Sequence, residues 1–235
     1  MEAWYRLGWW RPFTAAETIE VLGDADAVAS RAAEIVQSEV ASRGHTRIVL
    51  AGGTTPRRCY EVLASRPVAW GRVAILFGDE RCVPPQHAES NFLMASDALL
   101  RRSAPATVHR IPAELGPAVA AQLYEPIVAQ GPLDLVLLGL GSDGHTASLF
   151  PDNPALAARS LVTAVYDAPK PPGERVSLTL RALRAAKRVG FLVTGEDKAD
   201  ALRRALEGTV PAGLIPHAEW IADASATSRL DGRKR

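Results

Sequence analysis

The sequence predicts an α/β fold in which a mostly parallel β-sheet carries helices on both faces. Short apolar runs alternate with segments whose apolar residues recur at helical spacing. The clearest run, residues 133–138, is nearly all apolar, as expected of a parallel strand that helices cover on both faces. Turns rich in glycine or polar residues follow several runs. Strands and helices that alternate in this way form layered sheets with right-handed crossovers.

The elements are expected in the following order. An alanine-rich helix over residues 24–42 comes first. A buried strand over 47–51 leads through a glycine turn into a helix that ends near Ala64, and 72–77 is the next strand. The remaining expected elements are helices over 91–101, 116–130 and 197–206, and strands over 133–138, 161–165, 176–180, 188–194 and 219–221.

Composition is that of an ordinary globular protein. Hydrophobic residues make up 47% and charged residues 23%, which argues against disorder or a coiled coil. The formal net charge is +1, so no broad electrostatic footprint for nucleic acid or a membrane surface is expected. No apolar run approaches the ~18 residues of a membrane span. Two cysteines suit a reducing cytosol better than a disulfide framework.

We therefore expect one soluble, cytoplasmic domain over residues 1–235. Residues 1–13 are aromatic and charged, unlike a signal peptide, and we interpret them as an N-terminal arm. The charged residues 231–235 are interpreted as a frayed tail. No repeat or linker marks a domain boundary, and the oligomeric state stays open.

Unusual residues follow three expected strands, at the sheet edge where α/β proteins bind ligands. The first group is Gly52, Gly53, Thr54 and Thr55, with Pro56 suited to the first helical turn. Glycines let backbone N–H groups approach an anion, and threonine hydroxyls can donate hydrogen bonds. This is the composition of a phosphate-binding loop, although a tight turn with a helix cap has the same composition.

The second group is Asp79, Glu80 and Arg81, directly after an apolar strand. Arg81 could hold a phosphate or an oxyanion with its planar guanidinium, and Asp79 could orient Arg81. The alternative is an ordinary surface ion pair. We interpret Cys82 as a buried, unreactive thiol and Cys59 as a core residue.

The third group lies in a glycine-rich stretch that ends at Pro151. Its glycines satisfy G-x-G-x-x-G over residues 139–144, a pattern typical of dinucleotide binding. That fingerprint requires a full helix after the last glycine, and Pro151 and Pro154 leave hardly one turn for it. A dinucleotide site is therefore disfavoured.

A catalytic base explains the third group better. His145 follows Asp143 by two residues, and an imidazole can take a proton from water while a carboxylate fixes its tautomer. Ser142 does not fit a serine-hydrolase elbow, because Leu140 stands where a glycine is needed. The five histidines are scattered without metal-ligand spacing, so no metal site is expected.

Two more basic residues lie where they could reach a phosphate. Arg175 begins a strand, and Lys198 occupies a strand-to-helix turn. Taken singly, each is more typical of a solvated surface residue.

Together these segments resemble the 6-phosphogluconolactonase family over residues 44–222, in the order and spacing of that family. The matching stretches are Ala51 to Pro56, Gly78 to Pro84 followed by Ser90 and Asn91, Leu133 to Pro151, Arg175 to Thr179, and Gly195 to Lys198. The resemblance implies a carboxylic-ester hydrolase of the oxidative pentose phosphate pathway, which opens 6-phospho-D-glucono-1,5-lactone to 6-phosphogluconate without a metal or cofactor. It also implies a Rossmann-like fold shared with glucosamine-6-phosphate deaminase and ribose-5-phosphate isomerase.

The same resemblance implies a role for each candidate residue. His145 is the general base that activates water, Asp143 positions it, and Arg81 orients the substrate and offsets negative charge. The substrate and its phosphate are expected to contact Gly52, Gly53, Thr54, Thr55, Asp79, Arg175 and Lys198. The chain departs from the family pattern at Ala51 and Thr54, where serine is common, and at Asp152, where glycine is usual.

Three other functions were weighed. A deaminase of glucosamine 6-phosphate resembles a related group that carries an Asn-Glu-Pro stretch after its histidine, whereas residues 148–151 here supply no carboxylate. A non-catalytic sugar-phosphate sensor is favoured only where a catalytic position is missing. A nicotinamide enzyme depends on the disfavoured dinucleotide site.

Overall fold

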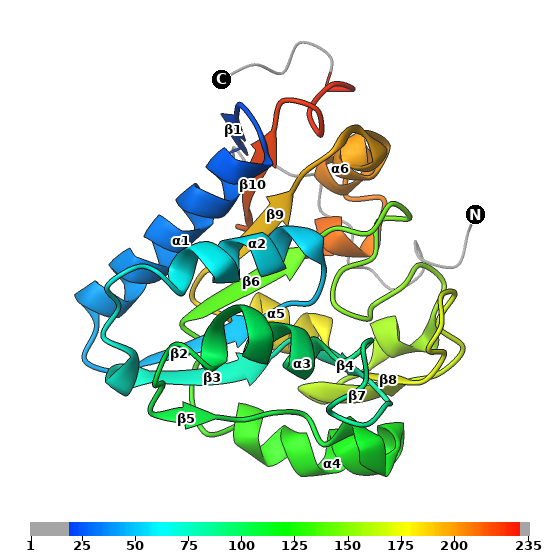
Figure 1. The fold of residues 1–235 in the computed structure, drawn as a ribbon. Helices are drawn as coiled ribbons and strands as arrows, with labels where there is room; N and C mark the ends of the chain where they lie inside the picture. The colour runs from blue at the N-terminus through cyan, green and yellow to red at the C-terminus, as the bar shows by residue number, and fades with distance from the viewer. Residues whose placement is uncertain (1–18, 231–235) are drawn as a thin grey trace.

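The computed structural model describes residues 19–230, which form two β-sheets (Figure 1). The larger sheet has seven strands in the order β1-β10-β9-β6-β2-β3-β5, and every neighbouring pair is parallel. The smaller sheet is antiparallel, in the order β4-β8-β7. The strands are β1 (Ile19–Leu22), β2 (Thr46–Leu50), β3 (Val73–Phe77), β4 (Asp79–Arg81), β5 (Thr107–Val108), β6 (Leu135–Gly139), β7 (Val162–Val165), β8 (Arg175–Leu178), β9 (Val189–Val193) and β10 (Glu219–Asp223).

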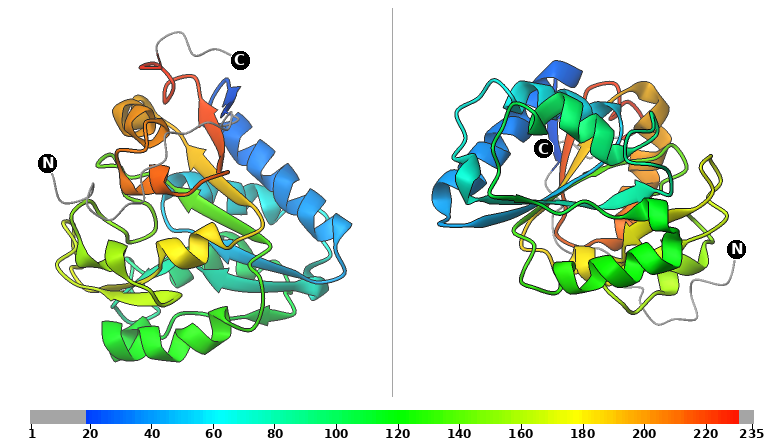
Figure 2. Two further views of the ribbon diagram at one scale, coloured as in Figure 1. Left: turned by 180° about the vertical axis from the view of Figure 1, so that it is seen from behind. Right: turned by 60° about the horizontal axis from the view of Figure 1, so that its bottom comes forward.

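Helices lie on both faces of the large sheet, as the second view in Figure 2 shows. This confirms the predicted fold class. The α-helices are α1 (Ala25–Ser42), α2 (Thr54–Leu63), α3 (Asn91–Ala95), α4 (Pro117–Val128), α5 (Leu180–Arg184) and α6 (Ala199–Leu206). A π-helical turn, η3 (Ser96–Leu100), continues α3, so the helix expected over 91–101 has two parts.

The core lies around the central strands of the large sheet. All residues of β3 and β9 are buried, and so are all but the last residue of β6. These strands consist mainly of valine, leucine, isoleucine and phenylalanine, because helices on both faces leave no solvent side for polar residues. Phe191 of β9 and Trp220 of β10 are register partners, and their rings stack with centroids 4.2 Å apart.

The first helix begins where its sequence predicts. The carboxylate of Asp24 accepts a hydrogen bond from the backbone N–H of Ala27 at 2.8 Å, which caps the N-terminus of α1. The buried face of α1 consists of alanine, valine and isoleucine.

The small sheet was not expected as a separate unit. The predicted strands over 161–165 and 176–180 pair with each other, and the second of them also pairs with β4, outside the parallel sheet. Strand β4 follows β3 after one residue, so it extends from the carboxyl end of the large sheet. Its sequence, Asp-Glu-Arg, has none of the residues that favour strands, and its conformation depends on pairing with β8.

Two short strands at the sheet edges, β1 and β5, were also not predicted. The aromatic arm over 1–13 and the tail over 231–235 lie outside the described residues.

Candidate active site

A cavity of ≈ 200 Å³ lies at the carboxyl ends of β2, β3, β6 and β9. Every site residue predicted from the sequence lines it, except Asp143. Those lining residues come from five separate segments: Gly52, Gly53, Thr54 and Thr55; Asp79 and Arg81; His145; Arg175; and Lys198. The prediction that these segments converge is therefore supported by the geometry.

The glycine–threonine loop forms the turn from β2 into α2. A Cβ at Gly52 would overlap the side-chain amide of Asn91, so only glycine allows this close approach. The hydroxyls of Thr55 and Thr194 lie 2.7 Å apart, which joins the start of α2 to the end of β9. The backbone N–H groups of the first turn of α2 are thus held at the cavity, where an anion could accept from them.

His145 and Asp143 form a close pair on the loop after β6. The Nδ1 atom of His145 lies 2.5 Å from Oδ1 of Asp143, and the backbone N–H of His145 donates to the same oxygen at 3.1 Å. Burial alone would raise the pKa of Asp143, but the hydrogen bond and charge of His145 outweigh it and lower that pKa to about 2. An ionised Asp143 accepts the proton on Nδ1, which leaves the lone pair of the neutral imidazole on Nε2.

The loop around His145 is fixed by its own hydrogen bonds. The hydroxyl of Thr146 donates to the carbonyl of Gly139 at 3.0 Å, and the N–H of Gly141 donates to the carbonyl of His145 at 2.9 Å. The His145 ring lies against Phe150 with centroids 4.5 Å apart. A Cβ at Gly141 would overlap the imidazole, which explains why glycine stands there.

Arg81 and Arg175 are direct cross-strand partners in β4 and β8. Like charges opposite each other destabilise a sheet unless an anion lies near them. Arg175 is buried, and burial lowers its pKa, an effect that Asp79 opposes and Arg81 strengthens. Arg81 donates from Nη1 to the carbonyl of Glu89 at 2.7 Å, whereas its buried Nε has no partner within the described part of the chain. The two guanidinium groups suit an anionic ligand.

Asp79 does not orient Arg81, contrary to the sequence-based interpretation. Its carboxylate accepts instead from the hydroxyl of Ser148 at 2.6 Å and from the side-chain amide of Asn91 at 3.2 Å. These partners enclose Asp79, which is 5% exposed. Asp79 therefore joins the His145 loop to the start of α3. Because Asp79 is buried, the alternative that it belongs to an ordinary surface ion pair is wrong.

Glu80 and Asn91 are functional candidates that the sequence analysis named without giving them a role. The carboxylate of Glu80 accepts from the N–H groups of Arg81, Asn91 and Phe92, each at 2.8 Å. Burial raises the pKa of Glu80, although these three N–H donors oppose the rise. Glu80 thus fixes the start of α3 against β4, and Asn91 lines the cavity. The helix cap Ser90 beside Asn91 was the available signal.

Lysines contribute to the cavity from two sides. Lys198 lies in a short 3₁₀ turn, η6 (Glu196–Lys198), and pairs with Asp197 at 3.0 Å. Lys170, to which the sequence analysis gave no role, also lines the cavity.

The structure also bears on two features that the sequence analysis set aside, the dinucleotide fingerprint and the two cysteines. The segment after Gly144 makes an isolated bridge between Thr146 and Leu149, and no α-helix follows before β7, so the dinucleotide fingerprint lacks its helix. Cys59 is buried, as expected of a core residue, whereas Cys82 is partly exposed and is not the buried thiol that the sequence predicted. Burial nevertheless raises the pKa of Cys82 to about 11 and that of Cys59 to about 12, which disfavours the reactive thiolate form of both.

No cluster of three metal-ligating side chains occurs between residues 19 and 230. Within the same residues, the helices are all too short or too polar to cross a membrane.

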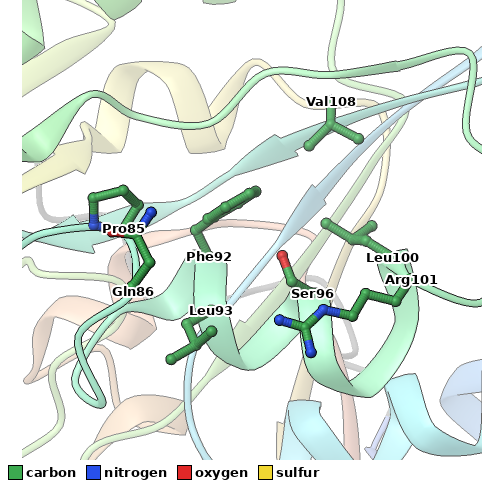
Figure 3. A pocket seen from close by; sticks show the side chains of 8 residues that line it. All are labelled: Pro85, Gln86, Phe92, Leu93, Ser96, Leu100, Arg101 and Val108. Carbon is green, nitrogen blue, oxygen red and sulfur yellow. The ribbon is translucent and has the colours of Figure 1, made fainter.

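A second cavity, of ≈ 380 Å³, lies beside α3 and η3 (Figure 3). Its one charged residue is Arg101, which pairs with Asp97 at 2.7 Å. The other lining residues are Pro85, Gln86, Phe92, Leu93, Ser96, Leu100 and Val108. With no catalytic pair and no free cation among these residues, this cavity does not suit an anionic substrate.

The chain is similar to known proteins along most of its length. The family model described as glucosamine-6-phosphate isomerases/6-phosphogluconolactonase matches residues 23–225. A 6-phosphogluconolactonase from Nostoc sp. is 36% identical over 238 residues, covering 91% of this chain and 98% of the relative. The human 6-phosphogluconolactonase is 41% identical over 187 residues, 72% of each chain. The crystal structure of 6-phosphogluconolactonase from Thermotoga maritima has a TM-score of 0.81 at 31% identity, and the match covers 88% of this chain and 99% of that one.

Proposed function

Because the chain belongs to the glucosamine-6-phosphate isomerase/6-phosphogluconolactonase family, we propose that it hydrolyses 6-phospho-D-glucono-1,5-lactone to 6-phosphogluconate, with His145 as general base. The observation that carries the proposal is the His145–Asp143 pair at 2.5 Å, in a cavity that also presents four cationic side chains. The activity belongs to the carboxylic-ester hydrolases.

The reaction begins with a water molecule between Nε2 of His145 and the lactone carbonyl. Nε2 takes a proton as the water oxygen bonds to C1, which gives a tetrahedral intermediate. The ionised Asp143 stabilises the imidazolium that forms. The bond between C1 and the ring oxygen then breaks, and the imidazolium returns the proton to that oxygen, which leaves as the C5 hydroxyl. General-base catalysis of this kind contributes about 10²- to 10⁴-fold.

The remaining residues bind and orient the substrate. Arg81 lines the cavity and offsets the negative charge of the tetrahedral intermediate. The phosphate accepts hydrogen bonds from the N–H groups and hydroxyls of Gly52, Gly53, Thr54 and Thr55, with Arg175 and Lys198 supplying positive charge. Asp79 shapes this site through Ser148 and Asn91.

We further propose that the whole chain is one domain in the cytoplasm, with the phosphosugar lactone as its ligand and no nucleic-acid partner. Both cysteines are free, and the net charge of +1 provides no broad footprint for nucleic acid.

The test is lactone hydrolysis by the purified protein, corrected for the spontaneous rate. We expect a clear acceleration with 6-phosphogluconolactone and a much weaker one with unphosphorylated gluconolactone. Ammonia release from glucosamine 6-phosphate tests the deaminase alternative in parallel, and a melting-temperature shift with NADP alone tests the nicotinamide alternative. Ammonia release without lactone hydrolysis would reverse the assignment.

A further inference from the structure

Lys170 differs from most of the other cations at the cavity in having no anionic partner. It lies on the loop between β7 and β8, and its side chain lines the cavity while staying exposed to solvent. Lys198 has Asp197 at 3.0 Å, and Arg81 has the carboxylate of Glu89 at 3.5 Å. Between residues 19 and 230, no carboxylate lies within 4.0 Å of the Lys170 ammonium.

The loop that carries Lys170 is held in place by Arg175. The Nη2 group of Arg175 donates to the carbonyl of Lys170 at 2.7 Å, and Nε donates to the carbonyl of Pro172 at 3.0 Å. The N–H of Ala168 donates to the carbonyl of Gly173 at 2.9 Å, which closes the base of the loop. Arg175 therefore determines where the backbone of Lys170 lies.

Arg175 is itself rigidly placed. It is 4% exposed, and its guanidinium lies 5.3 Å from the centroid of Phe150. Phe150 also contacts the His145 ring. The same aromatic side chain thus supports the catalytic histidine and, through Arg175, the loop that bears Lys170.

We propose that Lys170 is a substrate-binding residue that contacts the phosphate of the substrate, and that Arg175 is the positioning residue that holds Lys170 over the cavity. This inference rests on the proposed function and assigns a cation beyond those expected from the sequence. A phosphate monoester carries about two negative charges at neutral pH. A lysine without a competing carboxylate is free to pair with such a group.

The first experiment measures binding of the product, 6-phosphogluconate, by calorimetry, so it needs no turnover. The variant is Lys170→Met, and the matched control is Lys187→Met. Lys187 precedes β9 at the amino edge of the sheet, away from the cavity, and pairs with Asp134. We expect Lys170→Met to raise Kd about tenfold, as for the loss of one charge-assisted contact, and Lys187→Met to leave it unchanged.

Salt separates an electrostatic contact from a structural one. Affinity of the wild-type protein should fall more steeply with ionic strength than that of Lys170→Met, because salt screens an exposed cation. A Kd for Lys170→Met equal to that of the wild type at low salt overturns the role of Lys170. A wild-type protein that binds neither product nor inorganic phosphate contradicts the proposed function instead.

The second experiment tests the positioning role of Arg175. Arg175→Lys keeps the positive charge but loses the paired hydrogen bonds to the loop carbonyls. If Arg175 acts through Lys170, Arg175→Lys weakens product binding by itself but weakens it less than twofold when Lys170→Met is already present. The backbone N–H groups of the non-proline residues in 168–174 should also exchange hydrogen faster. Fully additive losses in Kd with unchanged exchange would overturn this role.

Discussion

The Nδ1 atom of His145 lies 2.5 Å from Oδ1 of Asp143, and the backbone N–H of His145 donates to the same carboxylate oxygen at 3.1 Å. One carboxylate thus fixes both the ring orientation of His145 and the turn that presents it. Burial opposes the ionised form of Asp143, yet the interactions with His145 lower its pKa to about 2. Asp143 therefore stays charged at neutral pH, as a partner for an imidazolium requires.

The first prediction concerns this pair. His145→Gln removes the base, so kcat for the phosphorylated lactone should fall by roughly 10²- to 10⁴-fold while the melting temperature changes little. Asp143→Asn keeps the size of the side chain but loses its charge. The loss of one charged hydrogen bond corresponds to a fall in kcat of about 10- to 10²-fold.

The double variant serves as the control for a shared role. If the two residues act as a unit, His145→Gln with Asp143→Asn is no slower than His145→Gln alone. A further large loss of kcat would mean that Asp143 acts independently of His145.

The second prediction concerns Gly141. A Cβ at this position would overlap the His145 ring, so Gly141→Ala displaces the imidazole from Asp143. We expect kcat to fall at least tenfold, since small misplacements of catalytic groups cost large factors in rate. Gly71→Ala is the matched control, because a Cβ there meets no atom within 4 Å. Equal kcat for both variants would show that the loop tolerates the displacement.

The third prediction concerns Asp79, which links two loops from inside the protein. Asp79→Ala removes both carboxylate oxygens, so the buried hydroxyl of Ser148 and the side-chain amide of Asn91 each lose an acceptor. Unfolding free energy measured in urea should fall by about 1–3 kcal/mol for each lost bond. Ser148→Ala removes only one of the two bonds and should cost less than Asp79→Ala. A smaller loss for Asp79→Ala than for Ser148→Ala would contradict this network.

Sequence reasoning located the strand ends well, because glycines and charged residues after an apolar run stand out from the pattern. It could not place β4, since three charged residues become a strand only through pairing with β8, far along the chain. For the same reason it gave Asp79 the wrong partner. The nearest charge in the sequence is Arg81, whereas the hydrogen-bonding groups in space are Ser148 and Asn91. Nothing in a proline-rich loop indicates that Lys170 turns to the cavity.

The last prediction concerns Cys82, which follows Arg81 in the sequence and could be mistaken for an activated thiol. Burial raises its pKa to about 11, and the nearby carboxylates of Glu174 and Glu80 add to the rise. The thiolate is the reactive form, so at pH 8 alkylation by iodoacetamide should be roughly a hundredfold slower than for a free cysteine. The alkylation rate should rise about tenfold per pH unit up to pH 10.

The control is Cys59, which is fully buried, with a pKa of about 12. Cys59 should react more slowly still, so Cys59→Ala should leave the native alkylation rate unchanged. Rapid labelling at pH 8 that Cys82→Ala abolishes would show that the Arg81 guanidinium outweighs burial and activates this thiol.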